Sequence, residues 1–170
     1  RAAVGGTGFA KVGGNYAGGM RATKKALENG CKEVLWLDAH EHKYVEEVGT
    51  SNAFFMIGDE IITAPLGGSI LPGVTRDSTI TLLRKWGYKV SERRLSIQEI
   101  EAASKDGSLQ EAWATGTACV ISPIGYLRYM DRDIVIHGGG VGPVSQKLYD
   151  HIYGMQTGVV ADDMGWIVQL

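Results

Sequence analysis

Lys11 is the first residue whose type and surroundings could carry chemistry. It stands in Phe9-Ala10-Lys11-Val12-Gly13-Gly14-Asn15-Tyr16, with apolar and glycine neighbours on both sides. A lysine amine that is shielded from water becomes a useful nucleophile and can form a Schiff base with a carbonyl compound. Most lysines are solvated surface charges, so Lys11 taken alone leaves both interpretations open.

Two adjacent carboxylates form the second candidate. Glu46 and Glu47 lie in a β-like stretch, Tyr44 to Asn52, that is bounded by small polar residues. Adjacent residues of a strand face opposite ways, so we expect at most one of the two carboxylates to point into a site and the other to be solvated. The alternative is an exposed edge strand without a site.

Two further segments could hold an anion. Leu71-Pro72-Gly73-Val74-Thr75-Arg76 reads as a glycine turn that opens a helix, whose free N–H groups and positive dipole end suit a phosphate. Thr115-Gly116-Thr117-Ala118-Cys119 reads as a turn at a strand end that carries two hydroxyl groups. Either could be an ordinary turn. The glycines near Lys11 fit neither the P-loop nor the dinucleotide-binding pattern.

The elements that must position these residues follow from apolar periodicity and from turn residues. Gly58-Asp59 indicates a hairpin turn, Ser96 to Glu99 a capping box, and Gly154 the end of the last helix. Without a regular strand–helix alternation, the pattern predicts an α+β domain that ends in a terminal strand or tail. We expect helices at 20–29, 74–86, 96–104 and 144–153, and strands at 33–37, 53–57, 60–64, 90–93, 111–115 and 118–122.

Composition limits the remaining function classes. The 170 residues, 44% hydrophobic, suffice for one domain, and a net charge of -2 gives no broad basic surface for nucleic acid or anionic membrane. Two cysteines without zinc-ligand spacing favour a reducing compartment, and we predict a cytoplasmic location. The four histidines share no ligand spacing, so we predict no metal site. Because the chain opens at Arg1 on a glycine-rich stretch, we expect a segment before it to be missing.

Four motifs, in this order and spacing, resemble the branched-chain amino acid aminotransferases. These enzymes are fold-type IV enzymes that depend on pyridoxal 5'-phosphate, and the resemblance spans essentially the whole chain. It implies that residues 1–170 form the large cofactor-binding domain, with many short strands in a barrel-like arrangement, and that the family's N-terminal small domain is absent. The motifs are Lys11 to Tyr16, Glu47 to Asn52, Leu71 to Arg76 and Gly116 to Ala118.

The resemblance also implies site roles. Lys11 would be the catalytic residue, bonded to the cofactor as a Schiff base and moving a proton when released. Eight further residues would bind the cofactor or the substrate. Tyr16 would bind the phenolic oxygen of the cofactor, Glu47 its pyridine nitrogen and Leu71 the face of its ring. The phosphate would be bound by the Val74 and Thr75 amides and the Thr117 hydroxyl, and Thr50 and Ala118 would line the substrate side.

The implied reaction exchanges an amino group between leucine, isoleucine or valine and 2-oxoglutarate in a homodimer. Trp36-Leu37-Asp38 and Ala118-Cys119 favour this group over D-amino acid aminotransferase and aminodeoxychorismate lyase, which stay as alternatives beside a non-catalytic scaffold. Ser122 stands where some relatives carry the second cysteine of a redox pair, so we predict no such switch. Half of the substrate site would belong to the absent domain, so we expect the isolated chain to be inactive.

Overall fold

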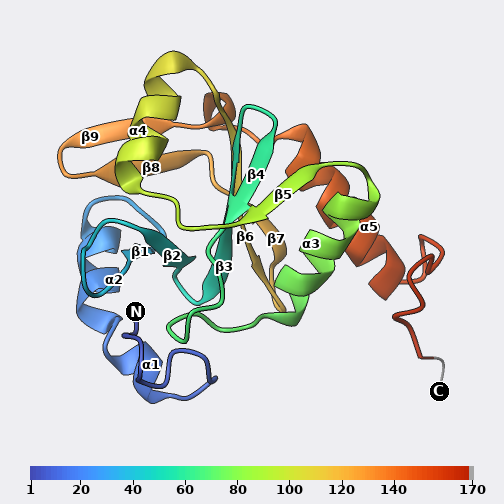
Figure 1. Ribbon diagram of the computed structural model, residues 1–170, viewed down its shortest axis with the longest axis horizontal. Coiled ribbons are helices and arrows are strands. Elements are labelled where there is room, and N and C mark those ends of the chain that lie inside the picture. Colours follow the sequence, from blue (N-terminus) through green and yellow to red (C-terminus); the bar gives the residue numbers. More distant parts are fainter. Residues whose placement is uncertain (169–170) are drawn as a thin grey trace.

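A computed structural model gives the fold, and residues 1–168 are described. The N-terminal part holds two short helices, α1 (Gly14–Ala17) and α2 (Met20–Glu28), which lie beside the sheet at the lower left of Figure 1. The chain then enters the strands and leaves along the long helix α5 (Pro143–Gln156) at the opposite side. None of the helices within the described range is long and apolar enough to cross a membrane.

A sheet of seven strands branches at its central strand β3. On one edge β3 pairs first with β2 and then with β4, and along its other edge it pairs with β6. All of these pairings are antiparallel, whereas β4 and β5 run parallel. The strands of this sheet are β1 (Leu35–Leu37), β2 (Val45–Val48), β3 (Ser51–Ile57), β4 (Glu60–Thr63), β5 (Lys89–Glu92), β6 (Leu109–Gly116) and β7 (Val120–Pro123).

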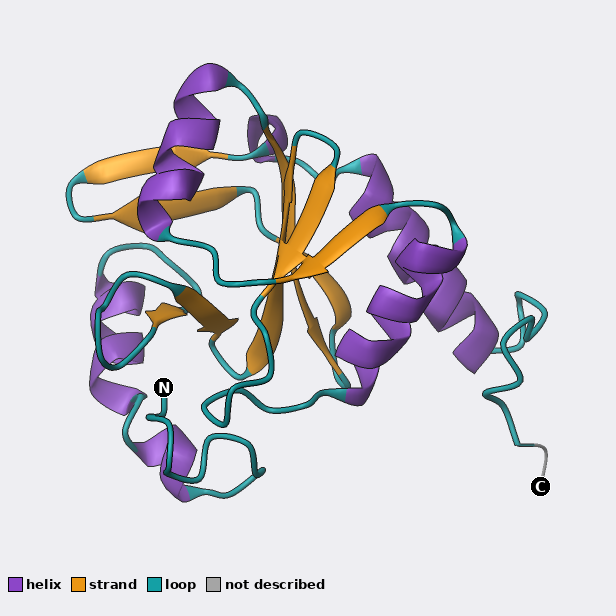
Figure 2. Cartoon of the chain, in the orientation of Figure 1, coloured by secondary structure: helices purple, strands orange, loops and turns teal. Residues whose placement is uncertain are grey.

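The two faces of the sheet bury separate apolar clusters, as the period of two along a strand requires. On β3, Phe55 packs with α4 (Ile97–Asp106) and a small hairpin, β8 (Tyr126–Tyr129) and β9 (Arg132–Val135). Its neighbour Phe54 packs with α3 (Val74–Lys85) and α5, and stacks on Trp113 at 5.6 Å between ring centroids. Figure 2 shows the helices gathered on either side of the strands.

Three helix ends have an identifiable cause. Ser96 caps α4 by accepting a hydrogen bond from the Glu99 amide at 3.1 Å, which confirms the predicted cap. Gly107 ends the same helix with a positive φ of 81°. The first turn of α5 is capped by Glu111, a buried residue of β6 whose carboxylate accepts from the Val144 and Ser145 amides at 2.9 and 3.0 Å.

Two expectations about the fold were wrong, and one pair of strands was not predicted. The strands do not close into a barrel within residues 1–168, because the end strands β1, β5 and β7 do not pair with one another. Gly154 does not end the last helix, which runs on to Gln156; a Cβ at Gly154 would lie 2.5 Å from Val160 Cγ2, so the glycine serves close packing. The β8–β9 hairpin was not predicted. The expected α+β class, the α3 helix and the Gly58 hairpin are confirmed, and the end of the chain is a tail to residue 168.

Candidate active site

Glu47 is the most enclosed charged group of the site region. It lies on β2, its residue is only 2% exposed, and it forms an ion pair with the Arg1 guanidinium through Oε2. Oε1 accepts from the Leu71 amide at 3.2 Å and from Asn52 Nδ2 at 3.3 Å. Arg1 is itself held by the Gly8 carbonyl at 2.8 Å, so the carboxylate has a fixed orientation.

These contacts leave Glu47 with acceptor capacity. A carboxylate offers about four acceptor positions, and the three protein donors fill both positions of Oε1 and one of Oε2. Burial raises the pKa of Glu47, whereas the charge of Arg1 and the Leu71 amide act to lower it. The buried carboxylate therefore keeps one acceptor position that no donor among residues 1–168 fills.

The turn after Leu71 joins this carboxylate to the start of α3. Asn52 Nδ2 also donates to the Leu71 carbonyl, at 2.9 Å. Two residues later, Gly73 precedes the helix in an extended conformation, and within the described chain no side chain caps its first turn. The first N–H groups of an α-helix have no partner inside the helix, so those of Val74 and Thr75 remain available for an anion.

The loop that carries Lys11 is organised by Asn15. The amide of this buried side chain donates to the Thr7 and Ala10 carbonyls at 2.9 Å each, and its oxygen accepts from the Thr7 hydroxyl at 2.7 Å. Lys11 and Tyr16 are exposed, and within residues 1–168 Lys11 makes no side-chain hydrogen bond. The same loop carries Gly8, which contacts the Ser69 backbone so closely that a Cβ would lie 2.4 Å from its carbonyl oxygen.

The remaining site candidates lie at the ends of strands. Thr50 sits in the turn between β2 and β3, and Thr117 and Ala118 sit in the turn between β6 and β7; all three are exposed. The two turns adjoin, because a Cβ at Gly116 would lie 3.0 Å from the Ser51 hydroxyl. The structure thus joins Glu47, Leu71 and the α3 terminus by direct contacts, whereas no hydrogen bond within the described chain joins Lys11, Tyr16, Thr50, Thr117 or Ala118 to that group.

Glu46 corrects the expectation that one of the two carboxylates is solvated. It is 9% exposed, and its Oε1 accepts from the Ser69 hydroxyl, while Oε2 has no partner within the described residues. The alternation of a strand does send the two side chains apart, but β2 is an inner strand, and the 65–70 segment covers Glu46. The burial of Glu46 therefore depends on the 65–70 segment, and the sequence pattern around Glu46 does not predict that contact.

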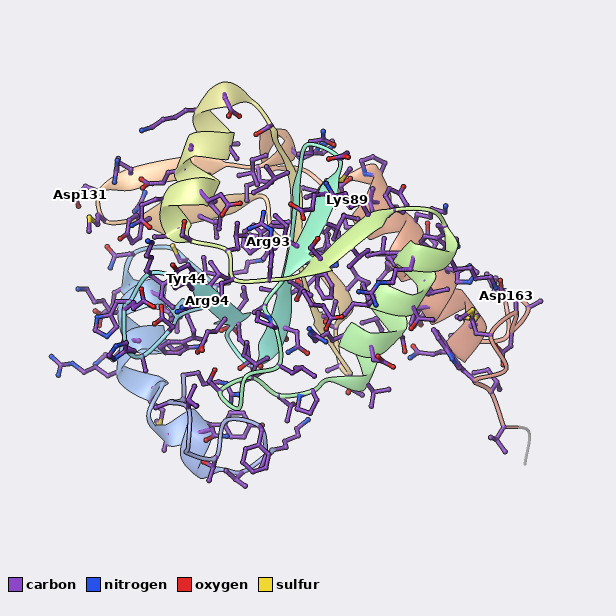
Figure 3. The ribbon with its side chains drawn as sticks, viewed as in Figure 1. Tyr44, Lys89, Arg93, Arg94, Asp131 and Asp163 are labelled. Carbon is purple, nitrogen blue, oxygen red and sulfur yellow. The ribbon has the colours of Figure 1, made fainter. Side chains whose placement is uncertain are left out.

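A cavity of about 610 Å³ opens at Glu46 rather than at Glu47. Its wall includes Asp38 and Arg94, whose guanidinium carbon lies 3.5 Å from the centre of the Tyr44 ring. Figure 3 shows the Tyr44 and Arg94 side chains next to each other at this wall. Backbone N–H groups of the 41–44 turn lower the pKa of Asp38, although its partial burial opposes them.

Sequence reasoning missed three residues that build the site: Arg1, Asn52 and Ser69. Each acts through a partner far along the chain, 46, 19 and 23 residues away respectively. Asn52 could have been noticed as a polar residue inside an apolar strand, because buried polar groups need partners. Arg1 and Ser69 give no comparable signal.

Comparisons with known proteins identify the family of the chain. The family described as "Amino-transferase class IV" matches residues 9–126. "Branched-chain-amino-acid aminotransferase 2" of Bacillus subtilis (strain 168) is 52% identical over 170 residues, which are all of this chain and 47% of that protein. A crystal structure of the Escherichia coli branched-chain amino acid aminotransferase superposes with a TM-score of 0.84 at 30% identity, covering 99% of this chain and 52% of that one.

A third relative was solved with a ligand. The T.th. branched-chain amino acid aminotransferase, complexed with N-(5'-phosphopyridoxyl)-L-glutamate, has a TM-score of 0.77 and 32% identity, covering 95% of this chain and 50% of that one. The chain thus spans about half the length of the relatives that it matches. Because the family match covers well over half of the residues and includes Lys11, Glu47 and the start of α3, the chain belongs to the class IV amino-transferase family.

Proposed function

We propose that the protein containing this chain is a branched-chain amino acid aminotransferase that exchanges an amino group between leucine, isoleucine or valine and 2-oxoglutarate. The relatives that carry this name match the chain over essentially its full length. The single structural observation that supports the proposal is the buried, oriented Glu47 carboxylate, which contacts the Leu71 turn just before α3, a helix start that no side chain of residues 1–168 caps. A pyridine ring with a phosphate arm needs both groups.

The residues present fit pyridoxal phosphate. Glu47 retains one acceptor position for a pyridine N–H, and the α3 N-terminus supplies amides for the phosphate that no side chain of residues 1–168 caps. The Thr115 hydroxyl is buried and has no partner within residues 1–168. It lies on β6 directly opposite Asn52, so it belongs to the same polar row as the carboxylate.

When bound, pyridoxal phosphate supplies an electron sink for the charge that forms as the substrate loses its α-proton. Glu47 would keep the pyridine nitrogen protonated, and the Lys11 amine would hold the cofactor and, once free, carry the proton between two carbons. The other residues would orient the ring and substrate: Tyr16 at the phenolic oxygen, Leu71 on the ring face, Val74, Thr75 and Thr117 at the phosphate, and Thr50 and Ala118 on the substrate side.

Three further properties complete the proposal. Residues 1–170 act as the cofactor-binding domain, and an additional small domain closes the substrate side; the half-length match to the relatives supports this division. The active form is a homodimer, as the family resemblance implies. The protein works in the cytoplasm, which suits the free thiols of Cys31 and Cys119.

Lys11→Ala tests the proposal in the whole enzyme. We expect it to abolish transamination of L-leucine with 2-oxoglutarate and the visible absorbance of the lysine-bound cofactor, because no other group can replace the amine. Lys105→Ala, which removes an exposed lysine at the end of α4, should change neither. Full activity of Lys11→Ala would refute the assignment. Preferential turnover of D-alanine or aminodeoxychorismate would replace it by one of the two related activities.

A further inference from the structure

Asn52 is a buried amide at the point where three strands meet. Its residue is 5% exposed. In the sheet it pairs with Glu47 of β2 on one edge and with Thr115 of β6 on the other. Directly opposite residues of an antiparallel pair place their side chains on the same side, so Asn52 stands between the carboxylate and the unpartnered threonine hydroxyl.

The side-chain nitrogen of Asn52 has both of its donors in use. One N–H points to Glu47 Oε1 at 3.3 Å, and the other to the Leu71 carbonyl at 2.9 Å. The Leu71 amide donates to the same Glu47 oxygen at 3.2 Å. Three hydrogen bonds therefore link Asn52, Glu47 and Leu71 in a ring. A carboxylate at position 52 could donate neither of the two hydrogen bonds that Asn52 donates.

The side-chain oxygen of Asn52 lies close against Gly73, in the turn before α3. A Cβ at Gly73 would lie 2.3 Å from Asn52 Oδ1, a separation that no real contact tolerates. Gly73 has φ −68° and ψ 135°, a conformation that any residue adopts. The backbone at position 73 would accept a side chain, but a Cβ there would force the Asn52 side chain out of its hydrogen-bonded position. The residues that follow it, Val74 and Thr75, begin α3.

We propose that Asn52 is a positioning residue that sets the pyridine contact and the phosphate contact of the cofactor relative to each other. Its nitrogen orients the Glu47 carboxylate, and its oxygen and nitrogen together place the Leu71–Gly73 turn from which the α3 amides emerge. The inference rests on the proposed function, because it assumes that a phosphorylated pyridine spans these two points. Asn52 itself need not touch the cofactor.

The experiment measures two binding constants in the whole enzyme after its cofactor is removed. The first is the Kd of pyridoxal phosphate, and the second is the inhibition constant of inorganic phosphate against cofactor rebinding. Asn52→Asp places an acceptor where both donors were, and Asn52→Ala removes the side chain. Ile100→Val is the control, since Ile100 is fully buried in the cluster under α4 and its truncation lowers stability without touching the site.

If Asn52 joins the two contacts, Asn52→Asp should raise the Kd of pyridoxal phosphate about tenfold or more, and Asn52→Ala about fivefold. The inhibition constant of phosphate should rise in both, because the α3 start moves. The pH midpoint of the bound cofactor's absorbance should shift as well, whereas Ile100→Val should change none of the three. Values within twofold of wild type in both Asn52 variants, or an unchanged phosphate constant, would overturn the inference.

A double-mutant cycle gives a second, independent measurement. The methyl group of Gly73→Ala collides with Asn52 in the wild type but finds room once residue 52 is alanine, so the double variant should bind the cofactor about as well as Asn52→Ala alone. Additive losses would contradict the coupling. The experiment separates the two proposals. If the wild type bound no pyridoxal phosphate, both proposals would be refuted. If the wild type bound it and the Asn52 variants bound it equally well, only the role of Asn52 would be refuted.

Discussion

Glu111→Gln provides a direct test of how the α5 helix is attached to the sheet. Glu111 lies on β6 and is 3% exposed, yet its two carboxylate oxygens receive the Val144 and Ser145 amides at 2.9 and 3.0 Å. These are N-terminal amides of α5, which have no partner inside the helix, and the negative charge also faces the positive end of the helix dipole. Glutamine keeps one oxygen but turns the other into a donor that faces an N–H group.

The expected cost follows from these contacts. One buried amide loses its acceptor, which costs about 1–3 kcal/mol, and the lost charge at the helix start adds up to about 2 kcal/mol. We therefore expect the free energy of unfolding to fall by about 2–4 kcal/mol, a large part of the roughly 5–15 kcal/mol of a typical domain. Gly142→Ala should act in the same direction, because its Cβ would lie 2.0 Å from Glu111 Cδ.

Amide hydrogen exchange at Val144 and Ser145, together with urea unfolding, would measure this effect. A loss of about 2 kcal/mol corresponds to roughly 30-fold faster exchange if the helix start opens locally. Glu28→Gln is the matched control, since Glu28 is exposed at the end of α2 and makes no side-chain hydrogen bond within residues 1–168. If both variants changed the free energy of unfolding by the same amount, within about 0.5 kcal/mol, the account of the buried cap would be refuted.

Three other predictions concern the site and its surroundings. Burial raises the pKa of Glu47 despite the opposing charge of Arg1, so its contribution to stability is complete below about pH 4.5 and is lost as the pH rises through the raised pKa. We therefore expect the difference in free energy of unfolding between the cofactor-free wild type and Glu47→Gln to decrease as the pH rises above 4.5. A difference that does not change with pH would contradict the raised pKa. For Asp38 the sign is opposite, because backbone N–H groups lower its pKa although burial opposes them. The difference in free energy of unfolding between the wild type and Asp38→Asn should therefore be constant above pH 3.8 and decrease in more acidic solution, which acid unfolding of both proteins would measure. Gly8→Ala should weaken cofactor binding in the whole enzyme several-fold, since its Cβ would lie 2.4 Å from the Ser69 carbonyl and would push the Lys11 loop away; unchanged binding would show that this contact does not position the loop.

Local patterns predicted the elements wherever local chemistry determines them. The helix at α3 and the hairpin at Gly58, with its positive φ of 58°, have their causes within a few residues. The β8–β9 hairpin lacks such a signal, because its turn uses Met130 at φ 53° instead of glycine or asparagine. Packing of Leu127 and Ile134 against the α4 cluster stabilises this hairpin, and a short window of sequence cannot contain that information.

The site was predictable as a set of motifs but not as a network. Glu47 and the Leu71 turn were identified from their residue types and from a family resemblance. Asn52, which connects them, was not, because its role exists only once β2, β3 and the turn before α3 are brought together. The prediction that Glu46 is solvated was wrong for a different reason. Strand alternation correctly predicts the direction of its side chain, but the segment that covers it lies about twenty residues further along the chain.

Arg1 is the positive charge that partly compensates the buried carboxylate of Glu47. A carboxylate as deeply buried as Glu47 would tend to be protonated, and a protonated acid could not keep a pyridine nitrogen charged. The guanidinium opposes that tendency, and the Arg1 side chain is only 6% exposed, so solvent screens the pair little. Because the guanidinium donates through Nε to Oε2 alone, Oε1 stays with Leu71 and Asn52, and a position on Oε2 remains open. Arg1 therefore offsets only part of the effect of burial on the pKa of Glu47, while its guanidinium, the Leu71 amide and Asn52 together fix the orientation of the carboxylate.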